Sequence, residues 1–173
     1  MKIGVYYAST SGNTEVVTDY IVDCLGADMV EPKNIADVGF AGIQDYELLM
    51  FGTPTWDYGH LQSDWEECWS ELEDLDLNGV VVALYGLGDQ YGYPEWYLDA
   101  MGIIYDKLKE KGVRVVGRWP NQGYDFEKSK ALIDDGKYFV GLALDEESQG
   151  LMTKERVTTW SCNVLEEYAE LID

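Results

Sequence analysis

Two unbroken apolar runs, at residues 48–51 and 80–84, constrain the fold of this chain more than any other feature of its sequence. Neither run alternates apolar with polar residues, so neither suits a strand that has one face in water. Continuous apolar runs are typical of strands buried on both faces, as in a parallel sheet. Helix-like segments separate the candidate strands, and this alternation predicts a doubly wound α/β fold with right-handed crossovers.

Four helices are predicted from apolar spacing and from their end signals. Gly26 is placed to end the first helix, and the sequence Ser-Asp-Trp-Glu at 63–66 resembles a capping box that opens a helix to about residue 75. A third helix is expected at residues 95–111. The first helix has an apolar face formed by Val17, Tyr20, Ile21 and Cys24. The C-terminal helix has a stripe formed by Val157, Trp160, Val164, Tyr168 and Leu171.

Shorter strand-like segments complete a five-stranded parallel sheet flanked by helices. They occur at residues 2–7, at residues 29–30 before Pro32, at 113–116 and at 138–144. The residues between the last two segments are interpreted as an insertion at one edge of the sheet, so these two segments count as one split strand. No linker, internal repeat or low-complexity segment occurs, so we expect a single domain over residues 1–173.

The charge balance excludes several kinds of partner. The chain has 12 Lys and Arg against 33 Asp and Glu, a formal net charge of −21. Nucleic acids and anionic membranes need a basic surface, so neither is expected as a partner. Residues 34–106 contain no Lys or Arg and 15 acidic residues. Most of these acids suit a solvated surface, and the balance favours basic protein partners and a monomer that self-repulsion keeps in solution.

Cysteine and histidine usage argues against metal or hydrolase chemistry. Cys24, Cys68 and Cys162 form no C-x-x-C pair, and free thiols in a reducing cytoplasm are expected. His60 is the only histidine. No secretory signal is evident at the start of the chain, and no apolar run reaches the roughly 20 residues of a membrane-spanning helix. A cytoplasmic protein is therefore expected.

The loops at the carboxyl ends of the strands are the place to look for a ligand, because doubly wound sheets bind ligands there. The first such loop combines hydroxyls, an amide and free backbone N–H groups at the start of a helix, which suits a phosphate. It has no Lys and matches neither the P-loop nor the dinucleotide pattern. An ordinary N-capped turn is the alternative. The loop consists of Ser9, Thr10, Ser11, Gly12, Asn13 and Thr14.

Two further loops each carry an aromatic residue at the end of a strand. Trp56 lies in residues 53–60 and Tyr93 in residues 87–94. Two aromatic side chains on neighbouring loops can sandwich a flat ring, while free backbone groups bind its polar edge. The alternative is that both are ordinary surface aromatics.

Together, these loops resemble those of flavodoxins. The matching motifs are S-T-S-G-N-T at 9–14, G-T-P-T-W-D-Y-G at 52–59 and G-L-G-D-Q-Y-G-Y at 86–93. The stretch from Gly123 to Glu146 matches as well, so the resemblance covers essentially the whole chain. An insertion that splits the fifth strand is similar to that of the long-chain class. The run E-W-Y-L-D-A-M-G is nearer to the second flavodoxin isoform of some bacteria.

The resemblance implies FMN as cofactor and assigns contacts to it. Residues 9–14 would hold the phosphate, and Asp145 would bind a ribityl hydroxyl. Leu87 stands where a polar residue is common in relatives, which puts one hydrogen bond at the ring edge in doubt. The inner side of the ring would face Thr55, Trp56, Asp57, Tyr58 and Gly59. The outer side would face Leu87, Gly88, Asp89 and Tyr93, with Tyr93 stacked on the ring.

The resemblance also implies a low-potential one-electron carrier with no substrate of its own. A basic NADPH-dependent flavodoxin/ferredoxin reductase would donate electrons, and basic acceptor enzymes would receive them. They would dock on acids near the ring edge, namely Asp57, Asp64, Glu66, Glu67 and Glu95. Three alternatives are an FMN-dependent NAD(P)H reductase of quinones, a phosphorylated receiver domain and a binding module without cofactor. Tyr93 over the ring argues against the first, and the lack of acids in residues 6–9 argues against the second.

Overall fold

The main sheet of the computed structural model, which describes residues 1–173, is built from parallel strands. Their spatial order is β2-β1-β3-β5-β10, which is the 2-1-3-4-5 order of one doubly wound class. The predicted fold class is therefore confirmed. The strands are β1 (Ile3–Tyr7), β2 (Val30–Asn34), β3 (Leu48–Trp56), β5 (Val81–Leu87) and β10 (Leu142–Leu144).

The last strand is split by an insertion, as expected. The strand β6 (Arg114–Val116) pairs with β5 at residues 81–83, and β10 pairs with β5 at residues 85–87. Residues 117–141 leave the sheet between these two pieces. They form a small antiparallel sheet from β7 (Trp119–Pro120), β8 (Leu132–Ile133) and β9 (Tyr138–Phe139).

The expectation of one continuous strand over residues 138–144 was wrong. Tyr138 and Phe139 pair inside the small sheet, and the chain changes sheets at residues 140–141. Gly141 permits this change, because a Cβ atom there would collide with the Leu84 carbonyl oxygen. The insertion therefore returns to the main sheet through a close backbone crossing over β5.

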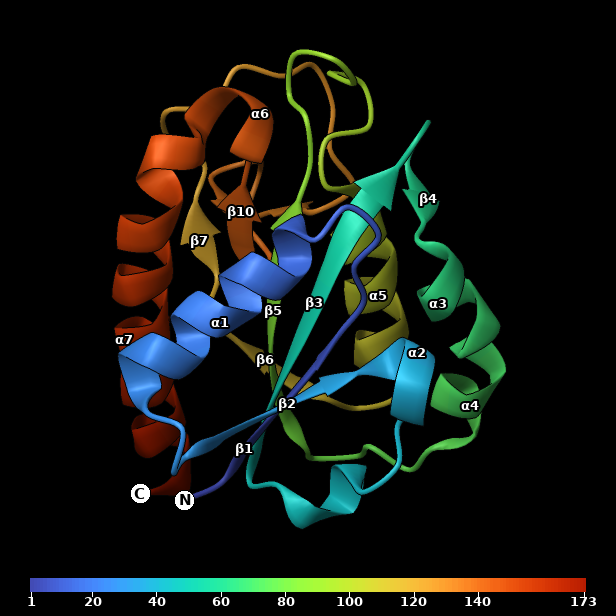
Figure 1. The fold of residues 1–173 in the computed structure, drawn as a ribbon, viewed down its shortest axis with the longest axis vertical. Helices are drawn as coiled ribbons and strands as arrows, with labels where there is room; N and C mark the ends of the chain where they lie inside the picture. Colours follow the sequence, from blue (N-terminus) through green and yellow to red (C-terminus); the bar gives the residue numbers. More distant parts are fainter.

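Helices cover both faces of the sheet (Figure 1). On one face, Val17 and Ile21 of α1 share an apolar cluster with Trp160 of α7. On the other face, Trp65 and Ile104 belong to a second cluster. The helices are α1 (Asn13–Leu25), α2 (Ile35–Val38), α3 (Ser63–Glu67), α4 (Trp69–Asp74), α5 (Asp99–Glu110), α6 (Glu146–Gln149) and α7 (Thr153–Ile172). Two 3-10 turns, η1 (Ile43–Asp45) and η2 (Gly150–Met152), connect other elements.

Several predicted boundaries differ from those of the structure. The helix expected from residue 63 to 75 is interrupted at Cys68, and its N-cap is Gln62, whose side chain accepts hydrogen bonds from Asp64 N and Trp65 N. The helix expected from residue 95 begins only at residue 99. At the C-terminus, Leu171 is exposed and does not extend the buried stripe of α7.

Two strands are longer than the sequence predicted. The strand β2 continues through Pro32, which is tolerated because β2 is an edge strand and its free edge needs no donor. The strand β3 continues to Trp56 and turns back through β4 (His60–Leu61), so Thr55 pairs with Leu61 and Trp56 with His60. The second loop is thus a hairpin that projects from the sheet.

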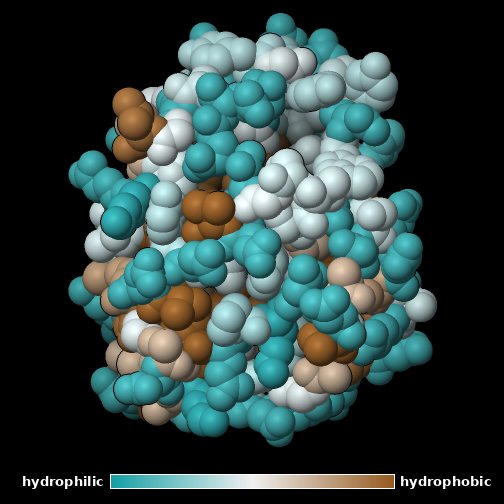
Figure 2. All heavy atoms as spheres, in the orientation of Figure 1, coloured by the Kyte–Doolittle hydropathy of each residue, from teal (hydrophilic) through white to brown (hydrophobic).

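The surface is dominated by hydrophilic side chains. Figure 2 shows them over most of one face, with only small and separate hydrophobic patches. This agrees with the excess of acidic residues in the sequence. None of the helices has the length and apolar character needed to cross a membrane.

Candidate functional site

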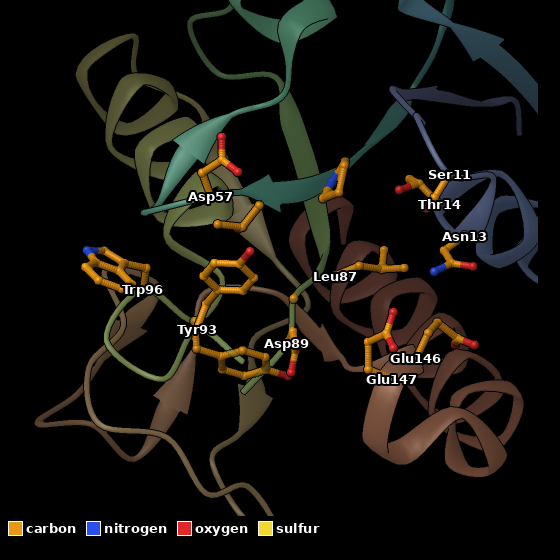
Figure 3. Close-up of a pocket in the computed structure, with 14 residues that line it drawn as sticks. Ser11, Asn13, Thr14, Asp57, Leu87, Asp89, Tyr93, Trp96, Glu146 and Glu147 are labelled. Carbon is orange, nitrogen blue, oxygen red and sulfur yellow. The ribbon is translucent and has the colours of Figure 1, made fainter. Parts of the chain in front are cut away.

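A cleft of about 200 Å³ lies at the carboxyl ends of β3 and β5, against the start of α1 (Figure 3). Ser11, Asn13 and Thr14 lie at one end of the cleft, and Tyr93 and Trp96 lie at the other. Four chain segments far apart in sequence therefore meet around one space. The lining residues are Ser11, Asn13, Thr14, Pro54, Thr55, Asp57, Leu87, Gly88, Asp89, Tyr93, Trp96, Tyr97, Glu146 and Glu147.

The first loop offers donors that have no partner within the protein. Thr14 Oγ1 is fully buried and makes no hydrogen bond. The backbone N–H groups of residues 10, 11, 13, 14 and 15 also donate to no protein acceptor. Gly12 holds the loop open in the left-handed conformation, with φ of 93°, and its N–H donates to Ser9 Oγ at 3.1 Å. This set of neutral donors at a helix start suits an anionic group.

Thr10 lies at the edge of this loop rather than in the lining of the cleft. Its side chain is exposed, and its Oγ1 accepts a hydrogen bond from Gln62 Nε2 at 3.2 Å. The same Gln62 caps α3, so the first loop is tied to the helix that follows the hairpin.

The hairpin after β3 contributes Pro54, Thr55 and Asp57 to the cleft. Asp57 has φ of 43°, a left-handed conformation that Asp adopts more readily than most residues. Thr55 Oγ1 accepts a hydrogen bond from Ala100 N at 3.1 Å, which anchors the hairpin to α5. Gly59, with φ of 86°, packs where a Cβ atom would lie 2.6 Å from Asp99 Oδ2.

The aromatic side chains are arranged differently from the simple sandwich that the sequence suggested. Tyr93 lines the cleft, while Trp56 is a half-buried residue of β3 that does not line it. Tyr58 is 64% exposed and packs edge-on against Trp96, with ring centroids 4.9 Å apart, and against Tyr93 at 6.5 Å. An exposed aromatic group thus closes one end of the cleft.

The third loop is shaped by Asp89 and by Asp145. Asp89 Oδ1 accepts hydrogen bonds from Tyr91 N at 3.2 Å and Gly92 N at 2.8 Å. The Asp145 carboxylate is fully buried and does not line the cleft. It accepts from Gln90 N and Nε2 and from Ser148 N and Oγ. Asp145 therefore positions the third loop and caps α6, which presents Glu146 and Glu147 to the cleft.

The insertion supports the same loop from outside. The Pro94 carbonyl accepts hydrogen bonds from Glu127 N at 2.8 Å and Lys128 N at 3.0 Å, and Tyr97 N donates to Lys128 O at 3.2 Å. Phe126 packs against Tyr97 in a tilted arrangement, with ring centroids 5.1 Å apart. Since Tyr97 lines the cleft, the insertion forms part of the scaffold of the site.

The cleft is lined by carboxylates and by no cation. Asp57, Asp89, Glu146 and Glu147 all belong to its lining, which includes no Lys or Arg. An anion bound there is held by neutral donors alone. Any further negative charge inside the cleft is opposed by its surroundings.

The cleft includes most of the residues predicted from the sequence. Ser9, Thr10, Gly12, Trp56, Tyr58, Gly59 and Asp145 lie in or beside the loops without lining the cleft. The sequence analysis missed Pro54, Trp96, Tyr97, Glu146 and Glu147. Trp96 and Tyr97 follow Tyr93 in an aromatic-rich run, and the two glutamates follow Asp145, so proximity to assigned residues was the available signal.

Comparison with known proteins identifies the class. A family model described as Flavodoxin matches residues 5–160. The chain belongs to the flavodoxin family, whose members bind FMN and transfer electrons rather than convert a substrate. The expectation from the loop motifs is therefore confirmed.

Among individual relatives, the chain is similar to Flavodoxin 2 of Salmonella typhi, with 48% identity over 98% of both chains. It is 47% identical to Flavodoxin 2 of Escherichia coli (strain K12), again over 98% of both chains. A solved structure of Fusobacterium nucleatum flavodoxin bound to flavin mononucleotide superposes with a TM-score of 0.89. That match has 34% identity and covers 96% of this chain and 98% of the other.

Proposed function

We propose that this chain holds FMN in the cleft and carries one electron at a time at low potential between redox proteins. The observation that supports this most directly is the buried and unpartnered Thr14 hydroxyl beside the free N–H groups of the first loop. A buried polar group without a partner is costly in a protein, and a phosphate supplies the missing acceptor. FMN, when bound, accepts and releases single electrons.

We assign the parts of FMN to the parts of the cleft in order. Residues 9–14 would hold the phosphate, with backbone N–H groups and hydroxyls in place of a cation. Residues 55–59 and the group Leu87, Gly88, Asp89 and Tyr93 would enclose the ring. The assignment of these contacts to individual residues stays a prediction. Glu146 and Glu147 line the cleft on the side nearer Asn13 (Figure 3), and hydroxyls of the ribityl chain would donate to them.

The side chains around the ring would orient it and exclude water. Tyr93 is 41% exposed and would cover the outer face, while Tyr58 and Trp96 close the end of the cleft. His60 is exposed and does not line the cleft. We therefore assign no catalytic residue, and no observation favours the alternative of an NAD(P)H reductase.

Flavodoxins accept electrons from reductases and donate them to acceptor proteins. For this chain we propose a basic NADPH-dependent flavodoxin/ferredoxin reductase as donor and basic enzymes as acceptors. Asp57, Glu66, Glu67 and Glu95 are exposed, and Asp64 is half-buried beside them in sequence. Charge complementarity at such acids mainly raises the association rate.

Thr14→Val tests the phosphate assignment. Loss of a hydrogen bond to a charged group costs ~1.5–3 kcal/mol, so FMN affinity should fall roughly 10- to 100-fold. Riboflavin, which lacks the phosphate, should lose little. Titrating the apoprotein with each flavin and following flavin fluorescence measures both affinities.

Ser161→Ala is the matched control, because Ser161 Oγ is the other buried hydroxyl without a partner and lies in α7. It should leave both affinities unchanged. Equal losses for FMN and riboflavin in Thr14→Val would contradict the phosphate assignment.

A further inference from the structure

Two of the three cysteines face the same seam between helices. The helices α1 and α7 lie side by side on one face of the sheet (Figure 1), and facing residues bring their Cα atoms within 8 Å. Cys24 lies in the last turn of α1 and is half-buried, while Cys162 lies midway along α7 and is exposed. Neither residue takes part in the flavin site.

The register of the two helices brings these cysteines together. One turn before Cys24, the Tyr20 ring lies under Lys154 Nζ at 5.8 Å. Residues four apart lie on the same side of a helix, so Cys24, one turn beyond Tyr20, faces α7 between Thr158 and Cys162, which lie one and two turns beyond Lys154. Burial raises the pKa of the Cys24 thiol, and the adjacent Cys162 thiol raises it further.

We propose that Cys24 and Cys162 form a reversible disulfide across the α1–α7 seam when the protein meets hydrogen peroxide. Cys162 is the exposed thiol, and as thiolate it attacks one peroxide oxygen. The O–O bond breaks, Cys162 becomes a sulfenic acid, and water leaves after protonation. Cys24 then attacks the Cys162 sulfur, an S–S bond forms, and the hydroxyl leaves as a second water with the Cys24 proton. Two thiols are oxidised and one peroxide is reduced to two waters.

The order of the two steps follows from exposure and pKa. The raised pKa of Cys24 keeps its thiol protonated, so it is the slower thiol to react with an oxidant from solution. Its position beside Cys162 suits it to resolve the sulfenic acid instead. The disulfide encloses most of the chain and restricts the unfolded state, so the oxidised protein should be more stable than the reduced one.

Cys68 provides an internal comparison. It lies between α3 and α4 on the other side of the sheet, and its thiol donates to the Ile35 carbonyl oxygen at 3.7 Å. Burial raises the pKa of Cys68 as well. With no second cysteine beside it, Cys68 has no partner for a disulfide within the chain.

The test uses the holoprotein, first fully reduced and then treated with hydrogen peroxide. Remaining thiols are alkylated before digestion with trypsin, which separates the cysteines into residues 3–33, 34–107 and 157–173. Mass spectrometry should find residues 3–33 joined to 157–173 in protein of monomer size, and a thiol reductant should release them. The oxidised protein should also have a higher thermal midpoint, and reduction should abolish that increase.

Two variants make the outcome decisive. Cys68→Ser should keep both the cross-linked peptides and the higher midpoint. Cys24→Ser should lose both and leave Cys162 to oxidise further or to link two chains. The proposal is overturned if the native protein yields only such dimers, or only overoxidised Cys162, without the cross-link within one chain.

Discussion

Asp99 is a buried residue whose ionisation the fold opposes. Its side chain is almost fully buried beneath the hairpin, and its Oδ1 accepts a hydrogen bond from Lys130 N at 2.8 Å. Burial raises the pKa of Asp99 above its ordinary value of 3.8, and the hydrogen bond offsets only part of this effect. Folding therefore disfavours the charged form of Asp99. The contribution of Asp99 to stability is fully present when the pH is below the pKa of this side chain in the unfolded chain. It is lost as the pH rises through the pKa of Asp99 in the folded protein.

Asp99→Asn should raise the free energy of unfolding at neutral pH. The amide keeps an acceptor for Lys130 N and removes the buried charge. Part of the decline in stability as pH rises above about 4 should also disappear. Urea unfolding at several pH values measures both effects. Asp106→Asn, on the exposed side of the same helix, is the control and should change neither. A less stable Asp99→Asn protein at pH 7 would show that the carboxylate is needed in its charged form.

At the scale of elements, Gln90 joins the third loop, the insertion and α6. Its Nε2 donates to Asp145 Oδ2 at 2.9 Å and to Ser148 Oγ at 3.2 Å, and its Oε1 accepts from Asp125 N at 2.6 Å. Gln90→Leu leaves these buried groups short of partners, at ~1–3 kcal/mol for each unsatisfied group. The apoprotein should unfold at lower urea concentration, and FMN affinity should fall because the loop loses its support.

Gln122→Leu is the matched control for this prediction. Gln122 lies within the insertion, and its side chain is exposed and makes no hydrogen bond. The urea concentration at which the Gln122→Leu apoprotein is half unfolded should stay near that of the native chain. If both variants unfold at the native midpoint, the insertion does not hold the third loop through Gln90.

The same elements show where sequence reasoning succeeds and where it stops. The apolar runs predicted β3 and β5 because burial on both faces leaves a local signature in the sequence. The division of residues 138–144 could not be predicted, since both halves are apolar and only contact with Leu84 separates them at Gly141. The loops of the site carried recognisable motifs. The place of Trp96 in the lining of the cleft depends on contacts between distant segments, and so does the role of Asp145 in positioning the third loop.

At the scale of the whole molecule, negative charge is mostly unpaired. With 33 acidic residues, the ion pairs involve only Lys2, Lys107 and Arg118 as cations. Most of these pairs are exposed and contribute little stability individually. The cleft and the acids around it therefore lie in a field of one sign, which attracts basic proteins and repels acidic ones.

Electron exchange with a basic redox protein should therefore slow as ionic strength rises. The Debye length falls from about 10 Å at 0.1 M salt to about 3 Å at 1 M, which screens attraction between the two surfaces before they meet. Stopped-flow measurement of the second-order rate constant across this range should show a steep decrease. A neutral small-molecule oxidant is the control, because it experiences no net attraction, and its rate constant should stay nearly constant. Exchange with the basic partner at a rate independent of salt would mean that docking does not use the acidic surface. In that case the excess of acidic residues would act only through repulsion between copies of this chain.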